Sequence, residues 1–196
     1  RDEWEFIEVN PMTGVKRPSE NPPRDRLIPD SEIEQICLVA GFDETKTTTV
    51  QGEVCVAFLF AIETAMRAGE ILKMVWKDVD IEKRTAFLPA KITKNGKKRT
   101  VALSTRAVEL LSLLPPTNRA TCFRPNSKQL DATFRKLKSK TTVGDLHFHD
   151  TRHEAITRLA KKMPVLDLAR NVGHTDINKL LIYYNEPAEN MAKLLD

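Results

Sequence analysis

The chain has 196 residues, with 31 Lys and Arg against 27 Asp and Glu, and a formal net charge of +4. This length predicts one domain with a tail, or one domain and a fragment of another, and it allows a sizeable core. No apolar run is long enough to cross a membrane. The three cysteines lack paired spacing, which favours reduced thiols in a cytosolic protein over a disulfide framework. The modest positive charge favours an anionic partner.

The first third of the chain predicts a boundary followed by two helices. Residues 1–30 are polar, basic and interrupted by prolines, as a linker would be. Ser31 and Glu34 form a capping-box pattern, so we expect a helix to begin there. Residues 52–64 are apolar on nearly every face, which predicts a buried central helix.

The middle of the chain predicts a small sheet and two amphipathic helices. Ser104 is expected to cap the first of these helices and Ser127 the second. Three short runs rich in β-branched and aromatic residues predict antiparallel strands: 76–81, 85–88 and 99–103.

The last third predicts further helices. Residues 155–163 carry one apolar stripe at helical spacing. Pro164 suits the first turn of the next helix and Gly173 its end. Residues 176–184 predict a short helix, and Pro187 can open a final one. The predicted fold class is therefore mainly α with a small three-stranded antiparallel β-sheet.

Chemically active side chains crowd into residues 147–184, which hold all four histidines and both tyrosines. This crowding exceeds what a core usually needs and marks a candidate active site. Two arginines outside any acidic cluster, Arg67 and Arg152, suit a phosphate, because guanidinium forks match its oxygens. A tyrosine hydroxyl is a poor nucleophile unless its proton is removed or its anion is stabilised, and an electropositive pocket would supply that stabilisation.

Three sequence boxes resemble those of the tyrosine recombinase (phage integrase) family. The first, T-A-M-R-A-G-E, has Arg67 and Glu70 at the family's arginine and acidic positions. The second, H-D-T-R-H, supplies the H-x-x-R pair. In the third, G-H-T-D-I-N-K-L-L-I-Y, Tyr183 follows His174 by nine residues, which is the family's spacing. The hairpin tip T-K-N-G-K-K resembles the loop with the family's lysine, and Lys94 aligns best there. The resemblance covers about residues 25–190.

The resemblance implies a site-specific DNA recombinase, such as an integrase of a phage or mobile element, with the tyrosine recombinase catalytic-domain fold. It implies that Tyr183 attacks the scissile phosphate to form a 3′-phosphotyrosine and that Lys94 protonates the leaving 5′-oxygen. Glu70 would support the pocket, and no metal or other cofactor would be needed. The remaining catalytic residues would bind the phosphate or assist proton transfer: Arg67, His149, Arg152 and His174.

The resemblance also implies double-stranded DNA as the partner and self-assembly into a tetramer on it, in the cytoplasm of a bacterial host. We expect the isolated domain to be monomeric. Residues 1–25 would be the end of a preceding core-binding domain and its linker, and residues 26–196 the catalytic domain.

Several alternatives compete with these assignments. A metal-dependent hydrolase could draw ligands from the histidine cluster. A DNA-binding regulator could keep the fold without the chemistry. Tyr184 leaves a one-residue ambiguity about the nucleophile, although a packing role is favoured for it, and a helix-surface position is favoured for His153. For Lys94, a solvated loop charge is the alternative. The hydrolase ligands would be His147, His149, Asp150, His153 and His174.

Overall fold

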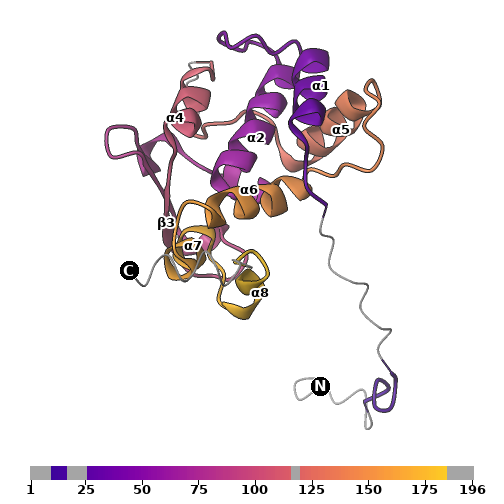
Figure 1. Ribbon diagram of the computed structural model, residues 1–196, viewed down its shortest axis with the longest axis vertical. Helices are drawn as coiled ribbons and strands as arrows, with labels where there is room; N and C mark the ends of the chain where they lie inside the picture. Colours follow the sequence, from indigo (N-terminus) through magenta and orange to yellow (C-terminus); the bar gives the residue numbers. More distant parts are fainter. Residues whose placement is uncertain (1–9, 17–25, 116–119, 185–196) are drawn as a thin grey trace, which may run out of the picture.

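The computed structural model describes residues 10–16, 26–115 and 120–184 (Figure 1). Within these ranges it is mainly helical, with one small sheet. The helices are α1 Asp30–Ala40, α2 Val50–Thr64, α3 Ala68–Ile71, α4 Thr105–Ser112, α5 Ser127–Lys138, α6 Asp150–Ala160, α7 Val165–Val172 and α8 Asn178–Leu181. The strands are β1 Val79–Asp80, β2 Thr85–Leu88 and β3 Arg99–Ala102, and two 3₁₀ turns lie at Trp76–Asp78 and Ala90–Ile92.

Helix α2 is the buried centre of the fold, as its all-round apolar sequence predicted. Its N-terminus is capped by Thr49, whose Oγ1 accepts a hydrogen bond from the Gly52 backbone N–H at 3.0 Å. Helices α1, α4, α5 and α6 pack around it (Figure 1). One hydrophobic cluster joins α2 to α4 and the sheet, and a second joins it to α1 and α5. The helix therefore gives a rigid base to the loop that follows it.

The three-stranded antiparallel sheet has the order β1-β2-β3, which confirms the predicted fold class. Thr85 pairs with Ala102 and Leu88 with Arg99, so β3 runs back along β2 from the hairpin tip. The Ser104 cap is confirmed, because its Oγ accepts from the Ala107 N–H at 3.0 Å. The first strand is shorter than predicted, since a 3₁₀ turn occupies the start of that run.

Three other predicted boundaries were wrong. Helix α1 begins at Asp30 after Pro29, and no side chain caps it. Asn126 caps α5, because its Oδ1 accepts from the Gln129 N–H while the Gln129 side chain bonds back. Helix α8 is only four residues long. The predicted helix after Pro187 lies outside the described residues.

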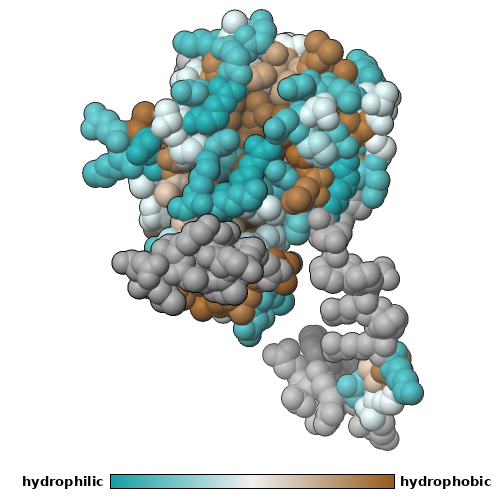
Figure 2. All heavy atoms as spheres, viewed as in Figure 1, coloured by the Kyte–Doolittle hydropathy of each residue, from teal (hydrophilic) through white to brown (hydrophobic). Residues whose placement is uncertain are grey.

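The α6–α8 layer forms a third hydrophobic cluster at one end of the body (Figure 1). Helix α7 also packs against β3, which ties this layer to the sheet. Hydrophobic residues reach the surface around α7 and α8 (Figure 2), where Leu166, Leu181 and Ile182 are more than 45% exposed. Among the described helices, none has both the length and the apolar character that a membrane span requires.

Candidate active site

The three boxes lie at helix ends: those of α2 and α7 and the start of α6. Helix α2 ends at Ala65, whose φ of 55° is left-handed, and the chain then turns into α3. Helix α6 starts directly after His149. Helix α7 ends at Gly173, whose φ of 69° also lies in the left-handed region. Each functional side chain therefore sits at or beside a helix terminus, where the backbone changes direction.

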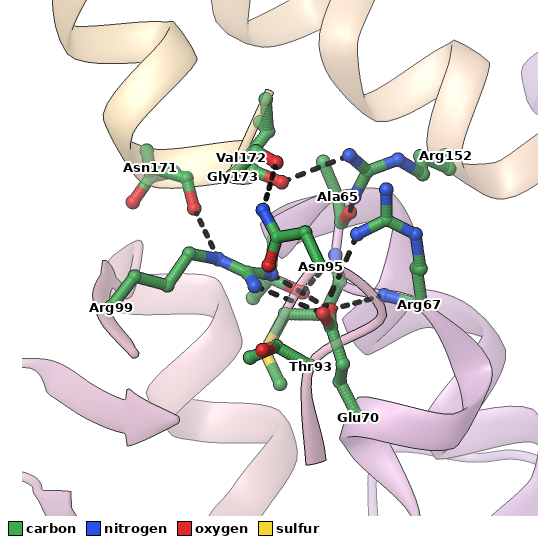
Figure 3. Close-up of polar contacts among 12 residues, drawn as sticks. Ala65, Arg67, Glu70, Thr93, Asn95, Arg99, Arg152, Asn171, Val172 and Gly173 are labelled. Carbon is green, nitrogen blue, oxygen red and sulfur yellow. Dashed lines mark hydrogen bonds and ion pairs between the residues drawn. The ribbon is translucent and has the colours of Figure 1, made fainter. Parts of the chain in front are cut away.

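Arg152 is the centre of the site and is only 5% exposed. Its guanidinium donates to the carbonyl oxygen of Ala65 and, at 2.9 Å, to that of Val172 (Figure 3). These bonds tie α6 to the ends of both α2 and α7. Burial, and then the positive charge of Arg67, lower the pKa of Arg152 to about 9. The guanidinium is still mainly charged at pH 7.

Arg67 lies beside Arg152 and keeps 27% of its side chain exposed. Glu70 is 1% exposed. It stabilises the start of α3, because its Oε2 accepts a hydrogen bond from the Arg67 backbone N–H at 2.9 Å. The Arg67 guanidinium is 3.5 Å from Glu70 Oε1, which is a loose contact. Glu70 thus lies beside Arg67 and bonds its backbone, while its supporting role in the site stays a prediction.

Arg99, which the sequence interpretation did not select, makes the closest ion pair with Glu70. Its two terminal nitrogens donate to the two carboxylate oxygens at 2.9 and 2.7 Å (Figure 3). Its Nε donates to the Asn171 carbonyl at 3.1 Å. An arginine that opens a short strand carries no sequence signal of burial, so pattern reasoning alone could not identify it.

The two predicted site histidines face the arginines. Loss of hydration, and then the charge of Arg152, lower the pKa of His149. The same two causes lower the pKa of His174 to about 4, so this imidazole is neutral at pH 7. Lys94 is exposed on the hairpin tip, yet lies close enough to His149 to contribute to its lowered pKa.

Tyr183 is half-buried, and its hydroxyl lies 2.8 Å from His153 Nδ1. His153 is thus partly buried and bonded, which corrects its assignment to the helix surface. Burial raises the pKa of Tyr183, while the charge of Arg152 acts to lower it. Tyr184 points elsewhere and donates to the Met163 carbonyl at 2.8 Å, so its predicted packing role is confirmed.

Two hollows flank the arginines. A cavity of about 220 Å³ is lined by Arg67, His149 and Arg152, by apolar residues, and by the polar residues Ser127, Asp131 and Thr151. On the other side, an open depression of about 470 Å³ is lined by Arg99, His174 and neighbouring residues. A basic, partly dehydrated site of this kind can bind a phosphate and stabilise charge in a transition state. Within the described ranges, no three His, Cys, Asp or Glu side chains are grouped to hold a metal ion.

The fold is similar to that of several solved recombinases. The crystal structure of XerA recombinase matches with a TM-score of 0.61 at 18% identity, over 93% of this chain and 66% of that one. A lambda integrase dimer bound to a COC′ core site matches with a TM-score of 0.66 at 16% identity, over 91% and 53%. The chain therefore has the fold of a tyrosine recombinase catalytic domain.

A model of the phage integrase family matches residues 30–190, so the chain belongs to that family. A Haemophilus influenzae protein with a provisional integrase/recombinase name is 43% identical over 100% of this chain and 64% of its own length. The shufflon-specific DNA recombinase of Escherichia coli is 33% identical over 100% and 49%. The chain thus spans about half to two thirds of these relatives. The comparisons give no support to the hydrolase alternative.

Proposed function

We propose that this chain is the catalytic part of a site-specific DNA recombinase that works through a covalent tyrosine intermediate. The observation that supports the proposal is the nearness of side chains from the three boxes: the charge of Arg67 acts on Arg152, and the charge of Arg152 acts on His174 and Tyr183. Arg152 is held by backbone carbonyls. These acceptors carry no net charge, so the positive charge of Arg152 is available to a phosphate.

In the proposed reaction, Tyr183 Oη attacks the scissile phosphorus, and the bond from phosphorus to the 5′-oxygen breaks. Arg67 and Arg152 stabilise the non-bridging oxygens, and the neutral imidazole of His174 donates a hydrogen bond to one of them. His149 assists removal of the tyrosine proton, and Lys94 gives a proton to the leaving 5′-oxygen. The phosphotyrosine link conserves the bond energy, so the reaction draws on neither a nucleotide nor a metal cofactor.

The partner we propose is double-stranded DNA. XerH recombinase is solved bound to its difH substrate, and Tn1549 integrase with transposon end DNA. We further propose a tetramer on DNA, and the exposed apolar residues on α7 and α8 support such self-assembly. Because the family match starts at residue 30, we retain residues 26–196 as the catalytic domain and residues 1–25 as the end of a preceding one.

A nicked DNA substrate would test the proposal. Cleavage next to the nick releases a short fragment with the 5′-hydroxyl, so the strand cannot be rejoined and the covalent adduct accumulates. Wild-type protein should form the adduct, and cleavage should persist in excess EDTA. Tyr183→Phe should form none while binding DNA nearly normally, because only one hydroxyl is lost. Tyr184→Phe is the matched control and should keep most activity, since its hydroxyl bonds the Met163 carbonyl.

Three results would contradict the proposal in different ways. DNA binding without any adduct would favour a non-catalytic regulator. Activity that requires added zinc or magnesium would favour the hydrolase. An adduct formed by Tyr183→Phe but not by Tyr184→Phe would assign the nucleophile to the neighbouring residue.

A further inference from the structure

Arg99 lies behind the catalytic arginines and connects elements that are distant in sequence. It belongs to β3, while its ion-pair partner Glu70 belongs to α3 and its carbonyl acceptor Asn171 to α7 (Figure 3). Its side chain is only 8% exposed. A buried arginine with every branch of its guanidinium bonded is held rigidly, so its contacts fix the relative positions of the three elements.

The first consequence concerns Arg67. Glu70 would be costly to bury as a lone carboxylate, and burial does act to raise its pKa. The hydrogen bonds from Arg99 and from the Arg67 backbone outweigh this effect, so the pKa of Glu70 is lower than normal. The fork of Arg99 occupies both carboxylate oxygens, whereas the Arg67 guanidinium is 3.5 Å away. Arg99 therefore neutralises Glu70, and the Arg67 side chain keeps its charge for another anion.

The second consequence concerns His174. Arg99 holds the Asn171 carbonyl at the end of α7, and its guanidinium lies against Gly173. A Cβ atom added at Gly173 would come within 3.1 Å of the guanidinium, so the glycine permits this close approach. On the same α7 end, the Asn171 side chain accepts from the Ala102 N–H at 2.8 Å. These contacts fix the direction in which the chain leaves α7 towards His174.

We propose that Arg99 is a positioning residue for strand cleavage: by pairing with Glu70 and holding the end of α7, it sets the places of Arg67 and His174 around the phosphate. This inference rests on the proposed recombinase function and assigns to β3 a part in the site, in addition to that of the preceding loop, which carries Lys94. Arg99 acts through its neighbours and does not itself contact the DNA phosphate.

The test uses the full-length protein and single-turnover cleavage of the nicked DNA substrate. Arg99→Gln should bind DNA within about threefold of wild type but cleave roughly 100-fold more slowly, the scale for one misplaced donor. Arg99→Lys keeps the charge but cannot form the fork, so we expect a rescue to about tenfold below wild type. If Arg99→Gln fails to fold, the Lys variant alone decides, because a wild-type rate for it would overturn the proposal.

The matched control is Arg124→Gln. Arg124 also pairs with a fully buried glutamate, Glu53, but this residue lies in the first turn of α2, at the opposite end of the helix from Ala65. This variant should lose stability as Arg99→Gln does, yet cleave at the wild-type rate under conditions where it is folded. A purely structural role for Arg99 predicts that the two variants behave alike.

A pH profile separates positioning from general destabilisation. The charged groups around the Glu70 carboxylate are Arg67, Arg99 and Arg152. Without Arg99, burial should raise the pKa of Glu70. As the pH is lowered, the cleavage rate of Arg99→Gln should therefore begin to fall at a higher pH than the rate of the wild-type protein. The Arg99→Gln/Glu70→Gln double variant has no carboxylate at position 70, so its cleavage rate should not show this fall at the raised pH.

The outcomes distinguish this proposal from the proposed function. No adduct from wild-type protein would reject the recombinase function itself. An adduct from wild type, with equal cleavage rates and pH profiles for Arg99→Gln and Arg124→Gln, would reject only the positioning role.

Discussion

Arg67 and Arg152 should respond differently to replacement, although both are predicted to bind the phosphate. Replacing either by Ala removes one preorganised charge, so each variant should cleave about 100- to 1000-fold more slowly. Their contributions to folding differ, because Arg152 is 5% exposed while the Arg67 side chain is 27% exposed. The two Ala variants should therefore differ in their free energy of unfolding, although their cleavage rates should be similar.

The expected loss of stability follows from the bonds of each guanidinium. Arg152 donates to two backbone carbonyls, and hydrogen bonds to charged groups contribute about 1.5–3 kcal/mol each. The cost of burying the guanidinium offsets part of this gain, so Arg152→Ala should lower the free energy of unfolding by about 2–4 kcal/mol. Arg67 makes only a loose pair with Glu70, so Arg67→Ala should cost less than about 1 kcal/mol.

Urea unfolding at pH 7 would measure these differences, with cleavage rates taken at a temperature where every variant is folded. Arg152→Lys should recover little stability, because one ammonium cannot span the carbonyls of both Ala65 and Val172. Equal unfolding free energies for the two Ala variants would refute the reasoning, since they would mean that the buried bonds of Arg152 add nothing.

Two further predictions concern histidines. The pKa of His174 is lowered to about 4, so an NMR titration of the DNA-free protein should give a midpoint well below 6.5. Because the unfolded chain binds this proton more readily, the stability linked to His174 should be complete above about pH 6.5 and decline as the pH falls towards 4. This decline should be missing in His174→Gln, and an unshifted midpoint would contradict the prediction. His153→Phe should keep the packing but lose the bond to Tyr183, which should slow cleavage about tenfold or more; an unchanged rate would show that this bond does not assist the nucleophile.

Much of the fold was predictable because its signals are local. Residues 52–64 of helix α2 are apolar on nearly every face, which favours a central helix. The Ser104 cap and the Gly173 stop depend on their own backbone geometry and were also predicted correctly. The errors in the helix starts are small: the α5 cap is Asn126, one residue before the predicted Ser127, and the N-cap position of α1 is Pro29, two residues before the predicted Ser31.

The candidate site was only partly predictable, because sequence spacing does not report long-range partners. The three boxes mark residues whose types suit phosphate chemistry. Arg99 and Glu70 are 29 residues apart, and nothing in either local pattern indicates the other. His153 was predicted to lie on the helix surface, but the hydroxyl of Tyr183, 30 residues later in the chain, lies within hydrogen-bonding distance of its ring.

The way the arginines are held explains how a basic pocket can persist without its anion. Burial, followed by the positive charge of Arg67 and to a smaller extent that of Arg99, lowers the pKa of Arg152. The carboxylate of Glu70 offsets one of the three positive charges, and it pairs mainly with Arg99. Arg152 is held by carbonyl dipoles, which stabilise a cation without neutralising it. The pocket therefore keeps an excess of positive charge in fixed positions, which is the condition for electrostatic stabilisation of a transferring phosphate at little reorganisation cost.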